Sequence, residues 1–214
     1  MIQEKTLDTS EDYLWAAFRE GSENAFDLIY GKMFSVLYDY GYRLCQDEEV
    51  VKDCIQNIFI EIWQKREQVP QVYSLKHYFL KIMRRKVFKV YECNREHTVQ
   101  AFYLESSLHR GGASNFPVLG VEAELEEVSP LTVRRLKEAI TQLSTRKKEA
   151  ILLKFFENLS YGEISEVMGL RDPKYARQLI YRSLDELRKH LKSSYGLSFS
   201  DCALYTALLL VFLT

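Results

Sequence analysis

Residues 160–188 carry the feature that most constrains the fold of this 214-residue chain. The run Ser160–Glu163 has the spacing of a capping box, which predicts the start of a short helix. Gly169 suits the positive φ of a tight turn, and Asp172 before a proline predicts the start of a long helix that ends near Leu191. A short helix, a glycine turn and a second helix predict a helix-turn-helix.

The second helix of this motif combines an inner apolar stripe with an outer basic one. The side chains expected to pack inside the motif are Ile164, Met168, Leu170, Tyr175 and Leu179. Those expected on the outer stripe or beside it are Arg171, Lys174, Arg177, Gln178, Tyr181 and Arg182. Arginine and lysine pair with guanine edges, glutamine pairs with adenine, and all three hold phosphates. The motif is therefore predicted to bind DNA, with a helical hairpin that merely has a basic surface as the alternative.

Helical periodicity extends over most of the remaining chain. The expected helices are about 11–20, 23–45, 48–68, 75–93, 131–143, 145–157, 160–168 and 173–191. Pro70 is expected to stop the third helix, and Ser74 is expected to cap the fourth. Because residues 10–95 hold no alternating pattern longer than a few residues, the fold class is predicted to be all-α.

The stretch 97–130 predicts a linker, because it combines a Gly-Gly pair, a proline and an acidic run with no helical period. About thirty residues without secondary structure are uncommon inside one compact domain and expected between two. The chain is therefore predicted to hold two small helical domains, residues 10–96 and 131–192, followed by an apolar tail, residues 193–214.

Charge is segregated along the chain, although the formal net charge is only −1. Residues 74–96 hold 7 Lys and Arg against 2 Asp and Glu, and residues 131–192 hold 14 against 8. The stretch between them, 97–130, has a net charge of −4. Two separate basic segments fit a polyanion that is contacted at two places. The alternative is a pair of solvated helix faces.

The residue inventory argues against catalysis and metal binding. The four histidines and four cysteines fall in no HExxH, CxxC or other metal-ligand spacing, and no glycine-rich phosphate loop occurs. We expect no enzyme activity, no catalytic residue, no metal and no cofactor. The acidic N-terminus lacks the basic start of a secretory signal, so a cytoplasmic protein with reduced cysteines is expected.

The third expected helix has one apolar face and one polar face. The apolar side holds Val51, Ile55, Ile58 and Ile62, widened by Phe59 and Trp63. The other side holds Asp53, Gln56, Asn57, Ile60, Glu61 and Gln64. The run DCIQNIFIEIW at 53–63 thus places an Asp-x-x-Gln-x-x-Phe pattern before an aliphatic residue and Trp.

With this pattern, the chain resembles the sigma-70 family of bacterial transcription initiation factors, in their short extracytoplasmic-function (ECF) type. Three further runs carry the resemblance: SLKHYFLKIMRR, LSYGEISEVMGL and KYARQLIYRSLDELRKHL. It covers about 11–95 as region 2 and about 131–191 as region 4. The resemblance implies a protein that binds core RNA polymerase and directs it to specific promoters. The alternative is a stand-alone helix-turn-helix regulator, with residues 11–95 as a sensing or dimerisation bundle.

The resemblance also implies which residues meet each partner. For the β′ clamp helices of core RNA polymerase they are Asp53, Gln56, Asn57, Phe59 and Ile60, with core packing as the alternative for Phe59. For region 4, the polymerase contact is the β flap, and the −35 element meets the outer basic stripe. For the −10 element, melted and read as a single strand, they are Tyr73, His77, Tyr78, Lys81, Arg84, Arg85 and Lys89. The family commonly has Asn and Asp where this chain has Arg85 and Lys89, so phosphate binding is expected to be kept.

An anti-sigma protein is a further partner that the resemblance implies. Residues 203–214 are nearly all apolar, but twelve residues fall short of the roughly 20 needed to cross a bilayer, and no membrane span is expected. Two roles stay open for this tail. It is either buried on one of the domains, or it holds regions 2 and 4 together and masks their DNA surfaces until polymerase binds.

Overall fold

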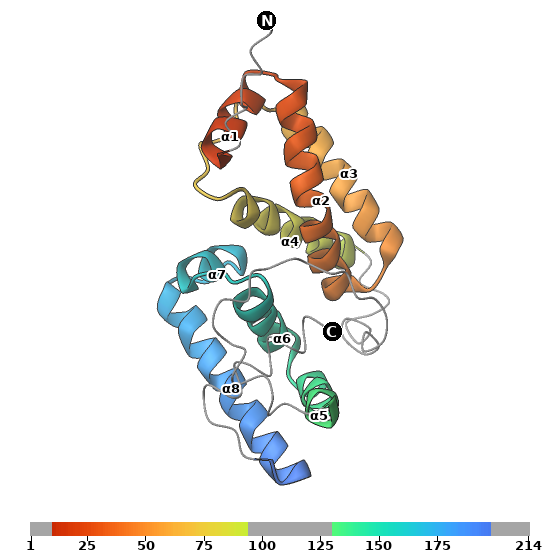
Figure 1. Cartoon of the computed structure of the whole chain (residues 1–214), viewed down its shortest axis with the longest axis vertical. Helices are drawn as coiled ribbons and strands as arrows, with labels where there is room; N and C mark the ends of the chain where they lie inside the picture. Colours follow the sequence, from red (N-terminus) through yellow and green to blue (C-terminus); the bar gives the residue numbers. More distant parts are fainter. Residues whose placement is uncertain (1–9, 94–129, 198–214) are drawn as a thin grey trace, which may run out of the picture. The chain divides into compact units, whose positions relative to one another are not determined.

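The computed structural model describes residues 10–93 and 130–197 and is helical in both ranges, with no strand in either (Figure 1). The chain divides into two compact units, Met1–Phe102 and Tyr103–Thr214. The all-α fold class is therefore confirmed for the described residues. Nearly all of the expected linker, and the apolar tail beyond residue 197, lie outside them.

The first unit contains four described helices, and side chains cap the first three at their starts. They are α1 (Glu11–Arg19), α2 (Glu23–Cys45), α3 (Glu48–Gln64) and α4 (Leu75–Cys93). Ser10 and Ser22 each accept a hydrogen bond from a backbone N–H in the first turn of α1 and α2. Asp47 accepts two such bonds at the start of α3. These caps satisfy N–H groups that have no partner within the helix, which is why short local signals placed the helix starts correctly.

The core of the first unit lies where α2 packs against both α3 and α4. Leu37 and Tyr40 from α2, Ile58 from α3 and Phe79 from α4 are all fully buried. Gly41 lies at the closest approach, because a Cβ there would come within 2.2 Å of Met83 Cε and 3.2 Å of a Val51 methyl carbon. The absence of a side chain at this position lets α2 approach both neighbours.

Helix α3 ends earlier than expected. The sequence predicts a helix to Gln68 that Pro70 stops, whereas the helix ends at Gln64. The following residues turn instead: Val69 N donates to Lys65 O over 3.1 Å, and Val69 is buried. The Arg66 guanidinium donates to Trp63 O, which satisfies a carbonyl at the helix end. A turn that buries Val69 thus follows α3, and the helix ends before Pro70 is reached.

The second unit contains four α-helices and one π-helix within its described range. They are α5 (Pro130–Thr141), α6 (Thr145–Ile151), η2 (Leu152–Phe156), α7 (Tyr161–Val167) and α8 (Pro173–Tyr195). The single helix expected over 145–157 is therefore an α-helix that widens into a π-turn, in which Glu157 N bonds to Leu152 O. No helix in the described ranges is both long enough and apolar enough to cross a bilayer.

Helix α8 runs four residues beyond its expected end at Leu191. The Tyr195 hydroxyl donates to Glu138 Oε2 over 2.7 Å, and the Arg135 guanidinium lies 5.1 Å from the centre of the Tyr195 ring. Both partners belong to α5. Packing against α5 therefore extends α8 to Gly196, whose left-handed backbone (φ 66°) ends it.

Candidate DNA and polymerase interfaces

Local hydrogen bonds build the helix-turn-helix of α7 and α8 as the sequence predicts. Ser160 Oγ accepts from Glu163 N, and Glu163 Oε2 accepts from Ser160 N over 2.8 Å, so the capping box is complete. At the other end of α7, Leu170 N donates to Ser165 O over 2.7 Å and Gly169 N donates to Glu166 O over 3.3 Å. This bond pair, with Gly169 at φ +64°, is a Schellman motif.

Replacing Gly169 by alanine is expected to lower the free energy of unfolding by about 1–2 kcal/mol. The cost comes from the backbone alone, because an added Cβ at Gly169 meets no atom within 4 Å. Gly162→Ala is the matched control: it adds the same methyl group inside α7, at ordinary contact distance from Ser160 Oγ, and should stabilise by about 1 kcal/mol. Urea denaturation of the full chain measures both. Equal effects of the two substitutions would contradict the described turn.

The inner stripe of α8 is shifted by one residue from the expected one. Tyr175 is 52% exposed, whereas Ala176 and Ile180 are buried. Ala176 suits a position where two helices approach closely, as does the small Ser165 on α7, whose hydroxyl donates to Gly162 O. The expectation that Tyr175 packs inside the motif is therefore wrong, and Ala176 is buried there instead.

The outer face of α8 presents basic and aromatic side chains to solvent. All six side chains that the sequence placed there are exposed: Arg171, Lys174, Arg177, Gln178, Tyr181 and Arg182. Tyr175 joins them, and it lines a shallow depression at the start of α8 together with Arg171, Asp172, Lys174 and Gln178. Sequence reasoning missed Tyr175 because it assigned the wrong helical phase. A surface with donors and an aromatic ring at a helix N-terminus can hold phosphates and base edges.

Aromatic contacts support the middle of this face. The Arg177 guanidinium lies 5.5 Å from the centre of the Tyr181 ring. Burial raises the pKa of Tyr161, and so does the hydrogen bond that its hydroxyl shares with Tyr181. Lys154 Nζ lies 5.0 Å from the centre of the Tyr161 ring. Residues of α7 and η2 thus restrain Tyr181 and, through it, Arg177.

The polar face expected on α3 is exposed, and Phe59, which the helical period places on the apolar side, is buried. Asp53, Gln56, Asn57 and Ile60 are all exposed, and Ile60 is 45% exposed. Phe59 is buried, and its ring centre lies 4.7 Å from that of Tyr30 and 5.2 Å from that of Phe79. Its side chain therefore belongs to the core, because the helical period places it with Ile55 and Ile62. We call the exposed group Asp53, Gln56, Asn57 and Ile60 the α3 face.

An ion pair joins α3 to α4 beside the α3 face. Lys86 Nζ lies 2.5 Å from Glu61 Oε1, and this hydrogen bond is the main reason that the pKa of Glu61 is lowered. The Lys86 side chain is only 21% exposed, so α4 contributes a partly buried cation to the contact. The pair links the helix that carries the α3 face to α4, which also carries Arg84, Arg85 and Lys89.

The side chains expected to meet the −10 element differ widely in exposure. Tyr73 is 99% exposed, and Arg85 and Lys89 are exposed. Half-buried are His77, Tyr78, Lys81 and Arg84. The Tyr78 ring lies edge-on to Trp15 with ring centres 5.4 Å apart, and burial raises its pKa. Part of the Tyr78 ring therefore packs against Trp15 and is not exposed to solvent.

Phe88 lies among the side chains expected to meet the −10 element, although the sequence did not predict it. The Arg84 guanidinium lies 4.4 Å from the centre of its ring. The four-residue spacing of the two side chains on a helix is the signal that predicts such a contact. The contact with Phe88 restrains the Arg84 side chain on α4, on the same helix as the exposed Arg85 and Lys89.

The described part of the chain contains no candidate metal site. No group of three His, Cys, Asp or Glu side chains there is placed to hold an ion. Cys45 and Cys54 are buried thiols outside any disulfide, and burial raises the pKa of the Cys54 thiol to about 11. A thiol with so high a pKa is protonated at neutral pH and is a poor nucleophile.

Known proteins resemble this chain over the second unit and beyond it. A family model described as sigma-70, region 4 matches residues 133–187, which run from α5 into α8. The chain is 22% identical over 173 residues to the ECF RNA polymerase sigma factor SigX of Bacillus subtilis. That alignment covers 79% of this chain and 85% of SigX, so it extends well beyond region 4.

Two solved structures share the helical fold. CnrH, in complex with the cytosolic domain of CnrY, gives a TM-score of 0.56 at 19% identity, over 85% of this chain and 96% of CnrH. RpoE of Bartonella quintana, in complex with the anti-sigma factor NepR, gives 0.54 at 18% identity, over 79% and 98%. The family expected from the sequence is thus confirmed by independent comparisons. The region 4 match and the similarity to SigX support a sigma-70 factor of the ECF type, and the two solved structures share its helical fold.

Proposed function

We propose that this chain binds core RNA polymerase and directs it to specific promoters as a transcription initiation factor. The observation that carries the proposal is the pairing, in one chain, of a helix-turn-helix with an exposed basic helix and a second unit with its own basic and aromatic surface. A stand-alone regulator would need only the first of these. The similarity to SigX over most of both chains also favours the initiation factor.

The second unit is proposed to read the −35 element as duplex DNA. Helix α8 presents its outer face from its N-terminal half, which is the part that enters the major groove in helix-turn-helix proteins. Lys174, Arg177 and Gln178 are exposed there and can pair with base edges. Arg182 follows one turn after Gln178 and is suited to a phosphate contact. The same unit is proposed to contact the β flap of the polymerase.

The first unit is proposed to hold the −10 element as a single strand. Capture of single-stranded DNA requires neutralised phosphates and flat surfaces on which bases stack. Arg85 and Lys89 supply exposed cations, and Tyr73 and the Arg84–Phe88 pair supply flat surfaces. His77, Tyr78 and Lys81 border this surface from the half-buried side of α4.

The α3 face is proposed to bind the β′ clamp helices of core polymerase. An exposed Ile60 surrounded by Asp53, Gln56 and Asn57 has the composition of a small protein interface, with an apolar centre and a polar rim. Phe59 supports this face from beneath, because its ring packs between α2 and α4. The Glu61–Lys86 pair holds the same face in register with α4.

We further infer a cytoplasmic protein that an anti-sigma protein holds inactive. Of the two structural neighbours, the sigma factor RpoE is in complex with the anti-sigma factor NepR, and CnrH is in complex with the cytosolic domain of CnrY. No catalytic, cofactor or metal-binding role is proposed for any residue. The function is that of a binding and positioning protein.

Reconstitution with bacterial core RNA polymerase tests the proposed function. The purified chain should co-elute with core polymerase on a sizing column. Core polymerase with the chain should start transcripts at defined sites on a genomic fragment library, and core polymerase alone should not. The 5′ ends of these transcripts identify the promoters. Tight binding of the free chain to duplex DNA as a dimer, with no affinity for polymerase, would instead establish the stand-alone regulator.

A further inference from the structure

One face of α1 makes hydrogen bonds to residues 70–75, the segment that leads into α4. Glu11, Trp15 and Arg19 lie four residues apart, so their side chains share a face of α1. Trp15 Nε1 donates to Pro70 O over 2.9 Å, and Arg19 Nη1 lies 3.5 Å from Gln71 Oε1. Leu75 N donates to Glu11 Oε2 over 3.1 Å. Three successive turns of α1 thus hold three points of the segment 70–75.

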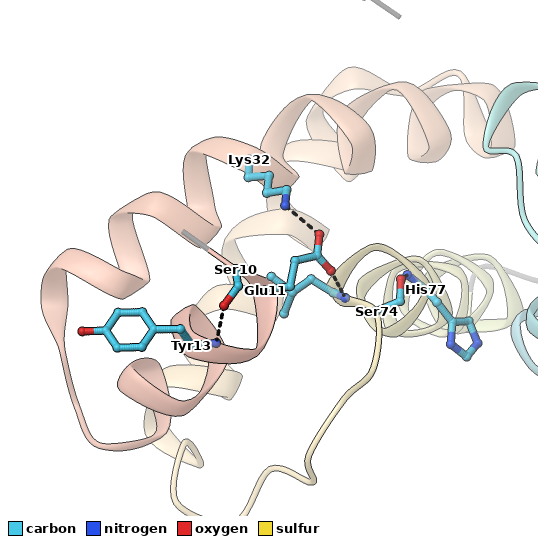
Figure 2. A network of polar contacts seen from close by, with 7 residues as sticks. Ser10, Glu11, Tyr13, Lys32, Ser74 and His77 are labelled. Atoms are coloured by element: carbon cyan, nitrogen blue, oxygen red, sulfur yellow. Dashed lines mark hydrogen bonds and ion pairs between the residues drawn. The ribbon is translucent and has the colours of Figure 1, made fainter. Parts of the chain in front are cut away.

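The Glu11 carboxylate joins three helices. Figure 2 shows it between Lys32 of α2 and the backbone at the start of α4, with Lys32 Nζ 2.6 Å from Glu11 Oε1. Burial raises the pKa of Glu11, but the hydrogen bonds from Lys32 and Leu75 outweigh it and lower the pKa overall. The group is therefore a carboxylate at neutral pH, as a negative charge at a helix N-terminus should be.

The first turn of α4 receives two acceptors as a result. Ser74 Oγ accepts from His77 N over 3.3 Å, and Glu11 accepts from Leu75 N (Figure 2). Both N–H groups lack a partner within α4. The serine cap is local, whereas the glutamate comes from a helix 64 residues earlier in the chain. The starting point of α4 is therefore set by α1.

Tyr73 lies between these attachment points and is 99% exposed. A single exposed aromatic side chain is ordinary on a protein surface. Here, however, the backbone is hydrogen-bonded on both sides of Tyr73, at Pro70 O and at Leu75 N, and the Gln71 side chain contacts Arg19 between them. A ring on a restrained segment loses little conformational freedom when a ligand stacks on it, which is the requirement for a pre-organised binding group.

We propose that Glu11, Trp15 and Arg19 are positioning residues that hold Tyr73 for stacking on an unpaired promoter base. They thereby determine base discrimination at one position of the −10 element, and do not contribute to polymerase affinity or phosphate binding. This inference rests on the proposed function and deepens it, because it assigns a role to α1, which touches neither partner in the proposal above.

Base discrimination by the reconstituted holoenzyme tests the proposal. The promoters mapped in the reconstitution are prepared with each of the four bases at every −10 position, and strand opening is measured by permanganate reactivity. Tyr73→Ala should lower strand opening by about ten-fold, which is the scale of one base–aromatic stack, and should flatten the base preference at one position, because stacking strength differs between bases. Trp15→Phe and Glu11→Gln should each lower discrimination at that same position by about three-fold or more. Discrimination at the other positions and affinity for core polymerase should stay unchanged.

Phe18→Leu is the matched control for loss of packing. Phe18 is a buried residue of α1 that stacks on Trp15 and takes no part in the three contacts with segment 70–75. This variant should lower the unfolding temperature and leave the discrimination profile unchanged. A Phe18→Leu profile that matches those of Trp15→Phe and Glu11→Gln would reduce α1 to a structural role and overturn the proposal. So would an unchanged profile in Tyr73→Ala, even while wild-type holoenzyme opens its promoters. A wild-type chain that opens no promoter would overturn the proposed function and this inference together.

Discussion

The double substitution Lys174→Ala/Arg177→Ala is expected to lower promoter-specific transcription by about 100-fold while leaving affinity for core polymerase unchanged. Both side chains are exposed on the outer face of α8, so their removal leaves the helix and its packing intact. Each good base contact is worth about 1–3 kcal/mol, and two losses near the lower end of this range multiply to about 100-fold. Run-off transcription from the mapped promoters measures the loss, and co-elution measures polymerase affinity.

Lys189→Ala is the matched control for this result. Lys189 is an exposed cation on the same helix, but it lies in the C-terminal half of α8 and within 3.9 Å of Asp185. Its removal should change transcription by less than two-fold, on the order of what an exposed ion pair contributes. An equal loss of polymerase affinity in the Lys174 and Arg177 variant would contradict the assignment of this face to DNA.

The double substitution Asp53→Ala/Gln56→Ala is expected to weaken binding to core polymerase by about 30-fold and to abolish transcription with it. Both side chains are exposed, so the free energy of unfolding should change by less than about 0.5 kcal/mol. Two interface contacts of about 1 kcal/mol each account for the loss. Titration of labelled chain with core polymerase measures the affinity.

Two further variants separate the interface from the core beneath it. Asp27→Ala removes an exposed acid from α2 and should leave polymerase affinity unchanged. Phe59→Ala should lower the free energy of unfolding by about 3–5 kcal/mol, because it empties a buried aromatic site. Retained co-elution of the Asp53 and Gln56 variant would move the polymerase interface away from the α3 face while leaving the function in place.

The candidate site was predictable to the extent that its signals are local. The outer face of α8 was predicted because cations repeat at helical spacing, and all six expected side chains are exposed. The prediction for the inner face of the same helix was wrong by one residue, because several apolar side chains of α8 repeat with nearly the same period. Only the tertiary structure selects one of these phases, in which Ala176 and Ile180 are buried. For Phe59 the sequence left two roles open, a polymerase contact implied by the family resemblance and packing in the core. The tertiary structure buries its side chain in the core.

The sequence by itself determined the helices, the turn of the helix-turn-helix and the family. Caps and Schellman turns are hydrogen bonds between residues at most five apart, so their donors and acceptors are readable in a short window. Only the tertiary structure decided where α3 and α8 end and how segment 70–75 is held. The groups that decide these features lie far apart in the chain: 55 residues separate Trp15 from Pro70, and 57 separate Tyr195 from Glu138. Such partners are brought together by burial of the core, which no local pattern specifies.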